Sequence, residues 1–476
     1  MGLKKNIAYN SLLTVTNYII PLIVFPYVAR ILGVENFGIY SFVDSTINYF
    51  LIISMLGITT VGIREIAKNK NNSTQLSQTF SSLFVLNSIS TFIVLILFFC
   101  TVFFVPQFSE QKKMFFIGGG KILFNLFLIE WLYIGTENFK YITIRSIIIR
   151  IIYTIAIFIF VRQKEDFDVY YFLTVATLVL NAIVNWLYGR KIAIFSIKSI
   201  DIKSFIKPSI ALGIYGLLNS FYTYFNVVYL GIVGSEEEVG YYATAIKVQS
   251  IFLSLYTAYS SVVMPHISSM IEEKKIEEFK ILINKSFENL YLFAIPIVYF
   301  SIILAPQIIY VLSGTGYEGA ILPMRIVMPL LLIIGVEQIL IVQILTPMRQ
   351  DKAILINSII GASIGLLLNI LLVRKFLSVG SSVVWIISEF TVFISAQYFV
   401  NKYSSIKINK KSLFKHLIFG LPYFVICIGT LMITSNSYTT LAISAILCIL
   451  YFIIEQILIF KNQFDLEFIS KFIKKY

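Results

Sequence analysis

The sequence predicts an all-α polytopic membrane protein with about 14 transmembrane helices of roughly 20 apolar residues each. Of the 476 residues, 58% are hydrophobic and 13% are charged, and the mean hydropathy is +0.85. Soluble globular domains carry about twice that share of charged residues. Apolar runs long enough to cross a bilayer recur along the whole chain, and the connectors between them are too short for a soluble domain.

The expected helices form two pseudo-symmetric lobes of six, followed by two further helices. The first lobe covers 1–188, a basic connector covers 189–208, the second lobe covers 209–400, and 401–476 holds the two additional helices and a tail. The expected spans are residues 7–32, 38–62, 80–104, 115–135, 141–162, 168–188, 209–233, 240–264, 286–312, 321–347, 353–374, 378–400, 413–434 and 439–460.

The distribution of positive charge predicts the orientation of the chain. Most of the 38 Lys and Arg residues lie in the tails and in alternate connectors, on the same side of the membrane as the N-terminus. Such an excess is typical of cytosolic segments, so both termini are expected in the cytosol. Basic loops beside anionic lipid explain the net charge of +13 without a nucleic acid partner.

The cysteines and histidines offer no metal or redox site. Cys100, Cys427 and Cys448 lie inside apolar runs, and His266 and His416 are isolated near expected inner loops. Neither pattern has the spacing of a disulfide framework or of a zinc site. We therefore expect no metal, no cofactor and no catalytic residue.

The first two expected helices each carry polar side chains along one face. Asn10 and Asn17 belong to a stripe on the first helix, and Asp44 and Asn48 are four residues apart on the second. Residues at spacings of three and four share a helix face, and polar groups at membrane depth are costly unless they meet water or a partner. The stripes favour a transport pathway, with hydrogen bonding between helices as the alternative explanation.

Arg30 ends the first apolar run, just before a short glycine-flanked turn at 33–38. On a straight helix it would lie about 220° around the axis from Asn17. A bend at Pro21 or Pro26 would bring it to the same face, and without one it extends to the membrane surface.

The seventh and eighth expected helices repeat the pattern of the first two. Tyr222, Asn226 and Tyr229 lie on one face of the seventh helix, and Lys247 lies in a hydroxyl-rich stripe of the eighth. The segment FGIY at 37–40 corresponds to VGYY 202 residues later. Duplicated lobes with a ligand site between them are a common transporter plan, which strengthens the interpretation of the stripes as cavity lining.

Four further charges lie within expected helices. Arg150 lies deep in the fifth helix, Arg325 near the outer end of the tenth, Glu337 near the middle of the tenth and Glu389 midway along the twelfth. An unpaired carboxylate at this depth is costly, so the two glutamates are functional candidates. The alternative is that each is paired or protonated.

The outer connector QKEDFD contains Asp166 and Asp168, at the spacing with which many glycosyltransferases hold a metal-bound nucleotide sugar. The connector is short, is expected on the side away from the cytosol, and has no accompanying domain. The glycines before Lys121 do not fit the Walker pattern of a nucleotide-binding loop. We therefore expect a transporter and not an enzyme.

Two blocks of the sequence are distinctive. One is the opening hairpin, NSLL followed by PLIVFPYVARILGVENFGIYSF and LGITTVGIREIAKNK; the other is ILTPMRQDKAILINSIIGASIGLLLNILLVRKF, with Glu389 following in WIISEF. Both resemble the Wzx-type flippases, which move undecaprenyl-diphosphate-linked sugar repeat units for bacterial O-antigen, capsule or exopolysaccharide. The resemblance extends through nearly the whole chain, although RKFLSVGSS lacks the proline and second glycine that the family often has there.

The resemblance implies a two-lobed multidrug/oligosaccharidyl-lipid/polysaccharide exporter fold in the bacterial cytoplasmic (inner) membrane, with a central cavity lined largely by spans one, two, seven and eight. The implied substrate is an undecaprenyl-diphosphate-linked oligosaccharide, whose phosphates suit Arg and Lys. The tyrosines would stack on sugar rings or serve only in packing. The expected substrate-binding residues are Arg30, Lys247, Arg150, Arg325, Asn10, Asn17, Asn48, Tyr222, Asn226 and Tyr229.

The resemblance also implies alternating access, in which the lobes rock about the cavity. Without a nucleotide-hydrolysis motif, the driving force is expected from a proton or sodium gradient acting on Asp44, Glu337 or Glu389, or from downstream removal of the product. A polysaccharide polymerase and a chain-length regulator are implied partners. The alternatives are a multidrug or organic-cation exporter, a lipid II flippase and, in a different class, a membrane glycosyltransferase or polymerase.

Overall fold

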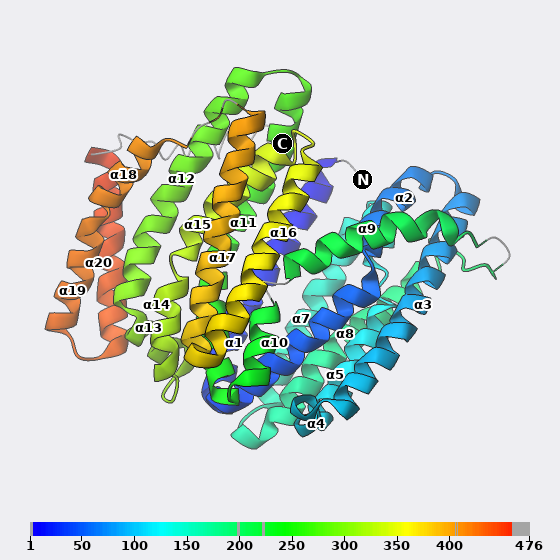
Figure 1. Cartoon of the computed structure of the whole chain (residues 1–476), viewed down its shortest axis with the longest axis horizontal. Coiled ribbons are helices and arrows are strands. Elements are labelled where there is room, and N and C mark those ends of the chain that lie inside the picture. The colour runs from blue at the N-terminus through cyan, green and yellow to red at the C-terminus, as the bar shows by residue number, and fades with distance from the viewer. Residues whose placement is uncertain (1–2, 198–199, 221–223, 405, 407, 459–476) are drawn as a thin grey trace. The chain divides into compact units, whose positions relative to one another are not determined.

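The computed structural model describes residues 3–197, 200–220, 224–404, 406 and 408–458, and every regular element among them is a helix (Figure 1). Ten of these helical segments are long and apolar enough to cross a membrane. The predicted all-α polytopic architecture is therefore confirmed. The total of 14 spans and the cytosolic termini stay predictions, because a continuous segment such as 351–403 counts as one span although it has 53 residues.

The opening hairpin forms one helical segment, α1 (Leu3–Met55), which is interrupted at Gly33. Gly33 has φ 75° and ψ 171°, a backbone conformation that residues with a Cβ rarely adopt. Pro21 and Pro26 both lie before this break. The interruption lies between the first two expected spans, at the start of the turn that the sequence predicts at 33–38.

The first compact unit, Met1–Gly240, is built around α1. Its other helices are α2 (Ile58–Asn69), α3 (Ser73–Phe104), α4 (Pro106–Glu110), α5 (Lys112–Asn125), α6 (Glu130–Gly135), α7 (Phe139–Phe160), η1 (Lys164–Asp166), α8 (Phe167–Gly189), α9 (Lys203–Ser220) and α10 (Asn226–Val233). α1 packs against α3, α5 and α7, and α8 packs against both α5 and α7. α2 and α9 lie beside each other at one end of the unit (Figure 1).

Aromatic side chains form the core at the end of this unit where α2, α3, α6 and α8 meet. The ring of Phe80 lies 5.6 Å from that of Trp131, and the ring of Phe84 lies 4.8 Å from that of Trp186. Such pairs contribute about 0.5–1.5 kcal/mol each beyond the burial of their surface. Trp131 and Trp186 directly follow Glu130 and Asn185, so this core fixes the position of two polar residues described below.

The second compact unit, Tyr241–Tyr476, contains most of α11 and the helices that follow. These are α11 (Glu236–Glu272), α12 (Ile276–Ile303), α13 (Ala305–Ser313), η4 (Glu318–Ala320), α14 (Ile321–Val327), α15 (Leu330–Glu337), η5 (Gln338–Leu345), α16 (Asp351–Leu368), η6 (Asn369–Val373), α17 (Arg374–Tyr403), α18 (Lys410–Phe419), α19 (Leu421–Ile433) and α20 (Ser437–Leu458). α17 packs against α14, α15 and α16, while α19 and α20 lie beside α12 and α13 (Figure 1).

The division into units falls after Gly240 and not at the connector 189–208. α9 and α10 follow that connector, yet both contact α1, and α9 also contacts α2 and α3. These contacts group the two helices with the first unit. The boundaries of the two six-helix lobes therefore stay a prediction.

The two halves of the sequence repeat touch each other within the first unit. A Cβ added to Gly38 would overlap the carbonyl group of Glu236, and a Cβ added to Gly240 would overlap the carbonyl group of Val34. Gly240 and Glu236 stand 202 positions after Gly38 and Val34, the same offset as in the sequence repeat. The contact is therefore reciprocal, as in a pseudo-two-fold arrangement.

We predict that Gly38→Ala destabilises the protein. The methyl group would meet backbone atoms, which cannot move as a side chain can, and such overpacking typically costs about 1–3 kcal/mol. Gly216→Ala is the matched control, because its Cβ would lie 3.9 Å from the nearest atom, a methyl carbon of Ile52. The midpoint of thermal unfolding in detergent should fall for Gly38→Ala only. Equal midpoints for both variants would contradict the close contact.

Candidate functional site

The predicted site residues are divided between the compact units, and each group is considered by itself. The first unit holds Arg30, Asp44, Asn48, Arg150, Asn226 and Tyr229, and the second holds Lys247, Arg325, Glu337 and Glu389. The other three, Asn10, Asn17 and Tyr222, lie outside the residues whose side chains the structure describes.

Asp44 forms an ion pair with Lys121 across the packed helices α1 and α5. The Lys121 Nζ donates to Asp44 Oδ1, while Asn48 Nδ2 donates to Asp44 Oδ2 at 3.1 Å. The side chains of Lys121 and Asp44 are 9% and 19% exposed, respectively. Each charge thus has a partner in a place where an isolated charge would be strongly disfavoured.

Three tyrosines lie around this ion pair. Tyr40 of α1 contacts Tyr170 and Tyr171 of α8, with ring centroids 5.1 Å and 5.9 Å apart. The Lys121 Nζ lies 5.5 Å from the centroid of the Tyr171 ring, a distance at which the face of the ring attracts a cation. Aromatic rings therefore surround this buried ion pair.

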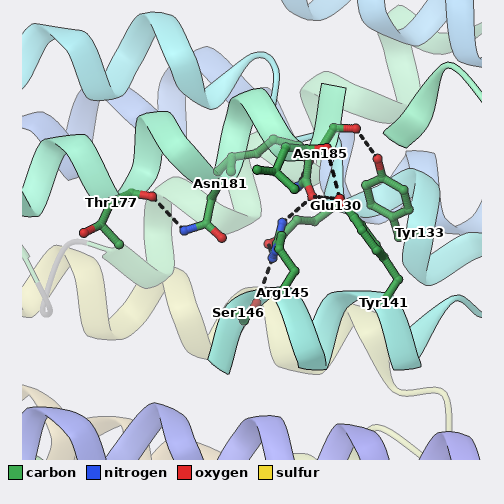
Figure 2. A network of polar contacts seen from close by, with 10 residues as sticks. Glu130, Tyr133, Tyr141, Arg145, Ser146, Thr177, Asn181 and Asn185 are labelled. Atoms are coloured by element: carbon green, nitrogen blue, oxygen red, sulfur yellow. Dashed lines mark hydrogen bonds and ion pairs between the residues drawn. The ribbon is translucent and has the colours of Figure 1, made fainter. Parts of the chain in front are cut away.

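A second charged network, which the sequence did not predict as a site, joins α6, α7 and α8 (Figure 2). Arg145 Nη2 donates to Glu130 Oε1 at 2.7 Å and to Ser146 Oγ at 2.8 Å, and Nη1 donates to Asn185 Oδ1. Asn185 Nδ2 donates in turn to the Leu128 carbonyl. The Arg145 side chain is 4% exposed and points from α7 toward Glu130 and Asn185 (Figure 2).

Arg145 stands near the start of the expected fifth span, where a basic side chain usually extends to the membrane surface. The structure buries it because the fourth span is broken between α5 and α6, at Ile129 with φ 39°, so that Glu130 begins a new helix beside α7. The sequence did contain a sign of this network, because Lys121 and Glu130 both lie in one apolar span. A charge at that depth needs a partner of opposite charge.

The other candidates of the first unit differ in their surroundings. Arg150 is half-buried, and its guanidinium forms no hydrogen bond or ion pair with any residue that the structure describes. Arg30 is exposed, and Asn226 is 1% exposed. Tyr229 stacks on Phe225 with ring centroids 5.8 Å apart, a contact that favours the packing alternative for this tyrosine.

In the second unit the structure brings Glu337 and Glu389 together. Glu337 ends α15, Glu389 lies within α17, and their carboxyl groups are close enough to influence each other electrostatically. Trp385 Nε1 donates to Glu389 Oε1 at 3.0 Å, and both glutamates are 6% exposed. Repulsion disfavours two negative charges at this separation, so the geometry suits a shared proton.

The backbone changes to a π-helix, η5, directly after Glu337. Gln338 Nε2 donates to Thr257 Oγ1 at 2.9 Å, and Gln343 Nε2 donates to Ser260 Oγ at 3.0 Å. Both hydroxyls belong to α11, so part of the hydroxyl stripe on the eighth expected span serves hydrogen bonding between helices. π-Segments are frequent at functional sites, here adjoining the glutamate pair.

Arg325 contacts the end of α12. Arg325 Nε donates to the carbonyl of Ile302 at 3.0 Å, in the last turn of α12. Carbonyls at a helix C-terminus lack partners within the helix, and a positive charge there is favourable. Arg325 thus stabilises the end of α12. Lys247 is half-buried in α11.

The Asp-x-Asp motif of the outer connector has a local structural role. Asp166 Oδ2 accepts from the backbone N–H groups of Arg162 and Gln163 at 2.8 and 3.1 Å, and Asp168 forms an ion pair with Lys113. Asp166 thus completes the capping box at the start of η1, while Asp168 places a negative charge in the first turn of α8, where it is favourable. Among the described residues, no group of three or more His, Cys, Asp or Glu side chains is placed to hold a metal ion.

The helices and their order define a transporter fold. The lipid II flippase MurJ, in an inward closed conformation, superimposes with a TM-score of 0.78 at 17% identity, covering 95% of this chain and 98% of MurJ. An outward-facing multidrug resistance MATE family transporter of the MOP superfamily superimposes with a TM-score of 0.57 at 12% identity, covering 84% of this chain and 95% of the transporter. The chain is thus a multi-pass membrane protein with the fold of these transporters.

The chain belongs to the polysaccharide biosynthesis protein family, whose model matches residues 3–271. A putative O-antigen transporter of Escherichia coli K12 is 25% identical over 82% of this chain and 94% of the relative. The probable low-salt glycan biosynthesis flippase Agl15 of Haloferax volcanii is 23% identical over 39% of each chain. Family, relatives and fold confirm the predicted resemblance and favour a transporter over an enzyme.

We predict that Lys121→Met and Asp44→Asn each destabilise the protein and that the double variant recovers most of the loss. Removing one partner of a buried ion pair costs about 3–5 kcal/mol, and less where one group keeps some contact with water, as Asp44 does. Lys113→Met, which removes an exposed lysine paired with Asp168, is the control and should have little effect. Thermal unfolding in detergent measures all four. Losses that add up in the double variant would contradict the pairing.

Proposed function

We propose that this protein moves a lipid-linked oligosaccharide across the cytoplasmic membrane of a bacterium for surface polysaccharide assembly. The observation that carries the proposal is the similarity to a putative O-antigen transporter over 94% of that relative's length. The fold, which is that of a lipid II flippase, supports it. The carrier that the sequence resemblance implies is undecaprenyl diphosphate. A polysaccharide polymerase and a chain-length regulator are the proposed partners that consume the product.

The substrate carries two phosphates and a sugar chain, so it needs cations and polar side chains. Arg30, Arg150 and Lys247 are the proposed phosphate contacts, because Arg and Lys form charge-assisted hydrogen bonds to phosphate. Arg150 has the strongest support, since its half-buried guanidinium makes no ion pair within the described part of the chain. Arg325 is the weakest candidate because its Nε already bonds the Ile302 carbonyl.

We propose alternating access as the mechanism, with the headgroup crossing while the lipid tail stays in the bilayer. The reciprocal contact of Gly38 and Gly240 supports this mechanism. The two repeat segments approach each other closely there because both glycines lack a side chain, and the Val34 side chain lies beside Gly240 as well. Small residues at a helix contact allow such close approach within a membrane.

The Glu337–Glu389 pair is the proposed ion-coupling site. A pair of carboxyl groups that shares one proton becomes unstable when that proton leaves, because two like charges then stand close together away from water. Loss or gain of the proton, or its replacement by sodium, would therefore change the packing of α15 against α17. Asp44 is a weaker candidate, since its carboxylate already has Lys121 as a counter-ion.

Transport of a fluorescent undecaprenyl-diphosphate-linked oligosaccharide in proteoliposomes, without nucleotide sugar, tests the proposed function. Flipping should exceed that of protein-free vesicles. Arg30→Gln and Lys247→Gln should each lower the rate roughly tenfold, since a charge-assisted hydrogen bond contributes about 1.5–3 kcal/mol.

Arg162→Gln, which changes an exposed residue of the outer connector, is the control for these variants. Unchanged rates for both Arg30→Gln and Lys247→Gln would contradict their assignment as phosphate contacts. Transport of organic cations or of lipid II, with none of the lipid-linked oligosaccharide, would contradict the proposed substrate.

Glu337→Gln and Glu389→Gln should each abolish stimulation of flipping by a proton or sodium gradient while gradient-free flipping continues. Glutamine keeps the size of the side chain and its hydrogen bonding, but it cannot release a proton. Glu455→Gln is the matched control, because Glu455 is a buried glutamate of the same unit that accepts a hydrogen bond from Tyr423. Full stimulation in either pair variant would exclude the pair as the coupling site.

A further inference from the structure

A groove of about 790 Å³ runs along α7 and α8 on the surface of the first unit. Its walls are apolar over most of their length, and the side chains of Ile148, Ile152, Leu180 and Val184 that form them are 39–53% exposed. Both helices are long and apolar enough to span the membrane. Exposed isoleucine, leucine and valine on a spanning helix face hydrocarbon, so the groove is open to lipid.

The length of the groove corresponds to one leaflet of the bilayer. The lining extends along α7 from Lys140 to Ile152, which is about 18 Å at roughly 1.5 Å per helical residue. Half of a hydrocarbon core about 30 Å thick, together with part of the headgroup region, has a similar depth. A single acyl chain of a phospholipid therefore fits this wall, whereas a polyisoprenyl carrier chain is longer.

One end of the groove is basic. Lys140, in the first turn of α7, is exposed and lines the groove. Lys191 lies 6.0 Å from the ring centroid of Tyr188, which stacks on Tyr141 at 3.9 Å. The nearby carboxylate of Glu137 already forms an ion pair with Lys70, whose Nζ lies 2.6 Å from Glu137 Oε1. The headgroup end of the groove thus attracts an anion.

Arg145 places a buried guanidinium at the same end. The residue lines the groove and is 6% exposed, and its Nε has no hydrogen-bond acceptor among the residues that the structure describes. Its Nη atoms are held by Glu130, Ser146 and Asn185 (Figure 2). The Nε itself is enclosed, so Arg145 contributes a positive charge beside the groove and not a hydrogen bond to a group inside it.

We propose that this groove binds an anionic phospholipid from the leaflet on the Lys140 side. The phosphate accepts a hydrogen bond from Lys140 Nζ beside the buried Arg145 guanidinium, and one acyl chain lies along the apolar wall. The polar side chains that line the groove are confined to its basic end, so the walls beyond offer no hydrogen bonds to a sugar chain. The lining therefore suits a phospholipid and not the lipid-linked oligosaccharide.

Native mass spectrometry of the full-length chain, titrated with dioleoyl-phosphatidylglycerol in detergent, tests this proposal. Lys140→Gln should weaken binding about fivefold, the effect expected for one basic side chain at an anionic lipid surface. Ile148→Trp, which fills the groove without changing the charge, should weaken it as well. Lys112→Gln, an exposed lysine at the start of α5, should bind as the unaltered protein does, and Lys140→Arg should restore binding.

Three results would overturn the proposal. One is equal phosphatidylglycerol binding by the unaltered protein and Lys140→Gln. Another is equal binding of dioleoyl-phosphatidylcholine and dioleoyl-phosphatidylglycerol, which would remove the role of the negative headgroup. The third is displacement of the phospholipid by undecaprenyl phosphate at lower concentration, which would assign the groove to the carrier lipid. Lys140 and Ile148 are surface residues of α7, so these variants leave the core intact.

Discussion

A charge inside a bilayer needs a partner within the protein, because hydrocarbon offers neither water nor counter-ions. Much of the polar structure of both units follows from this constraint. Asp44 pairs with Lys121, and Arg145 pairs with Glu130, so two ion pairs tie α1 to α5 and α6 to α7. In the second unit the partners are instead two carboxyl groups on α15 and α17. The helices are therefore held at defined registers by a few contacts within an otherwise apolar interior.

These pairs differ in what they can do. An ion pair of opposite charges keeps both of its charges over a wide range of pH, and it stabilises one arrangement of helices. A pair of carboxyl groups depends on the proton between them, so its stability changes with the occupancy of that site. We therefore propose that the ion pairs of the first unit form a fixed scaffold and that the glutamate pair of the second unit is an exchangeable site. The adjoining π-helix places irregular backbone next to the exchangeable site.

The network around Arg145 connects the interior of the first unit with the surrounding lipid. Its Nη atoms bond residues of α6, α7 and α8, and the residue also lines the basic end of the groove. A phosphate held by Lys140 would lie beside this guanidinium and interact with its charge. Lipid composition would then act on the packing of α6, α7 and α8 through one side chain, separately from the carrier lipid that we propose as substrate.

The sequence by itself determined the all-α architecture, the turn that begins at Gly33, the internal repeat at 37–40 and 239–242, and the class of protein, whereas the contact between Gly38 and Gly240 came from the structure. The length of an apolar run, the conformational freedom of a glycine and the identity of a residue are local properties, so they can be predicted before the tertiary structure is known. Only the tertiary structure decided the pairing of the charges. Asp44 and Lys121 are 77 residues apart, and helical periodicity states which face a residue occupies but not which distant helix meets that face. For the same reason, the bond from Arg325 to the end of α12 and the burial of Arg145 became visible only when the helices were packed.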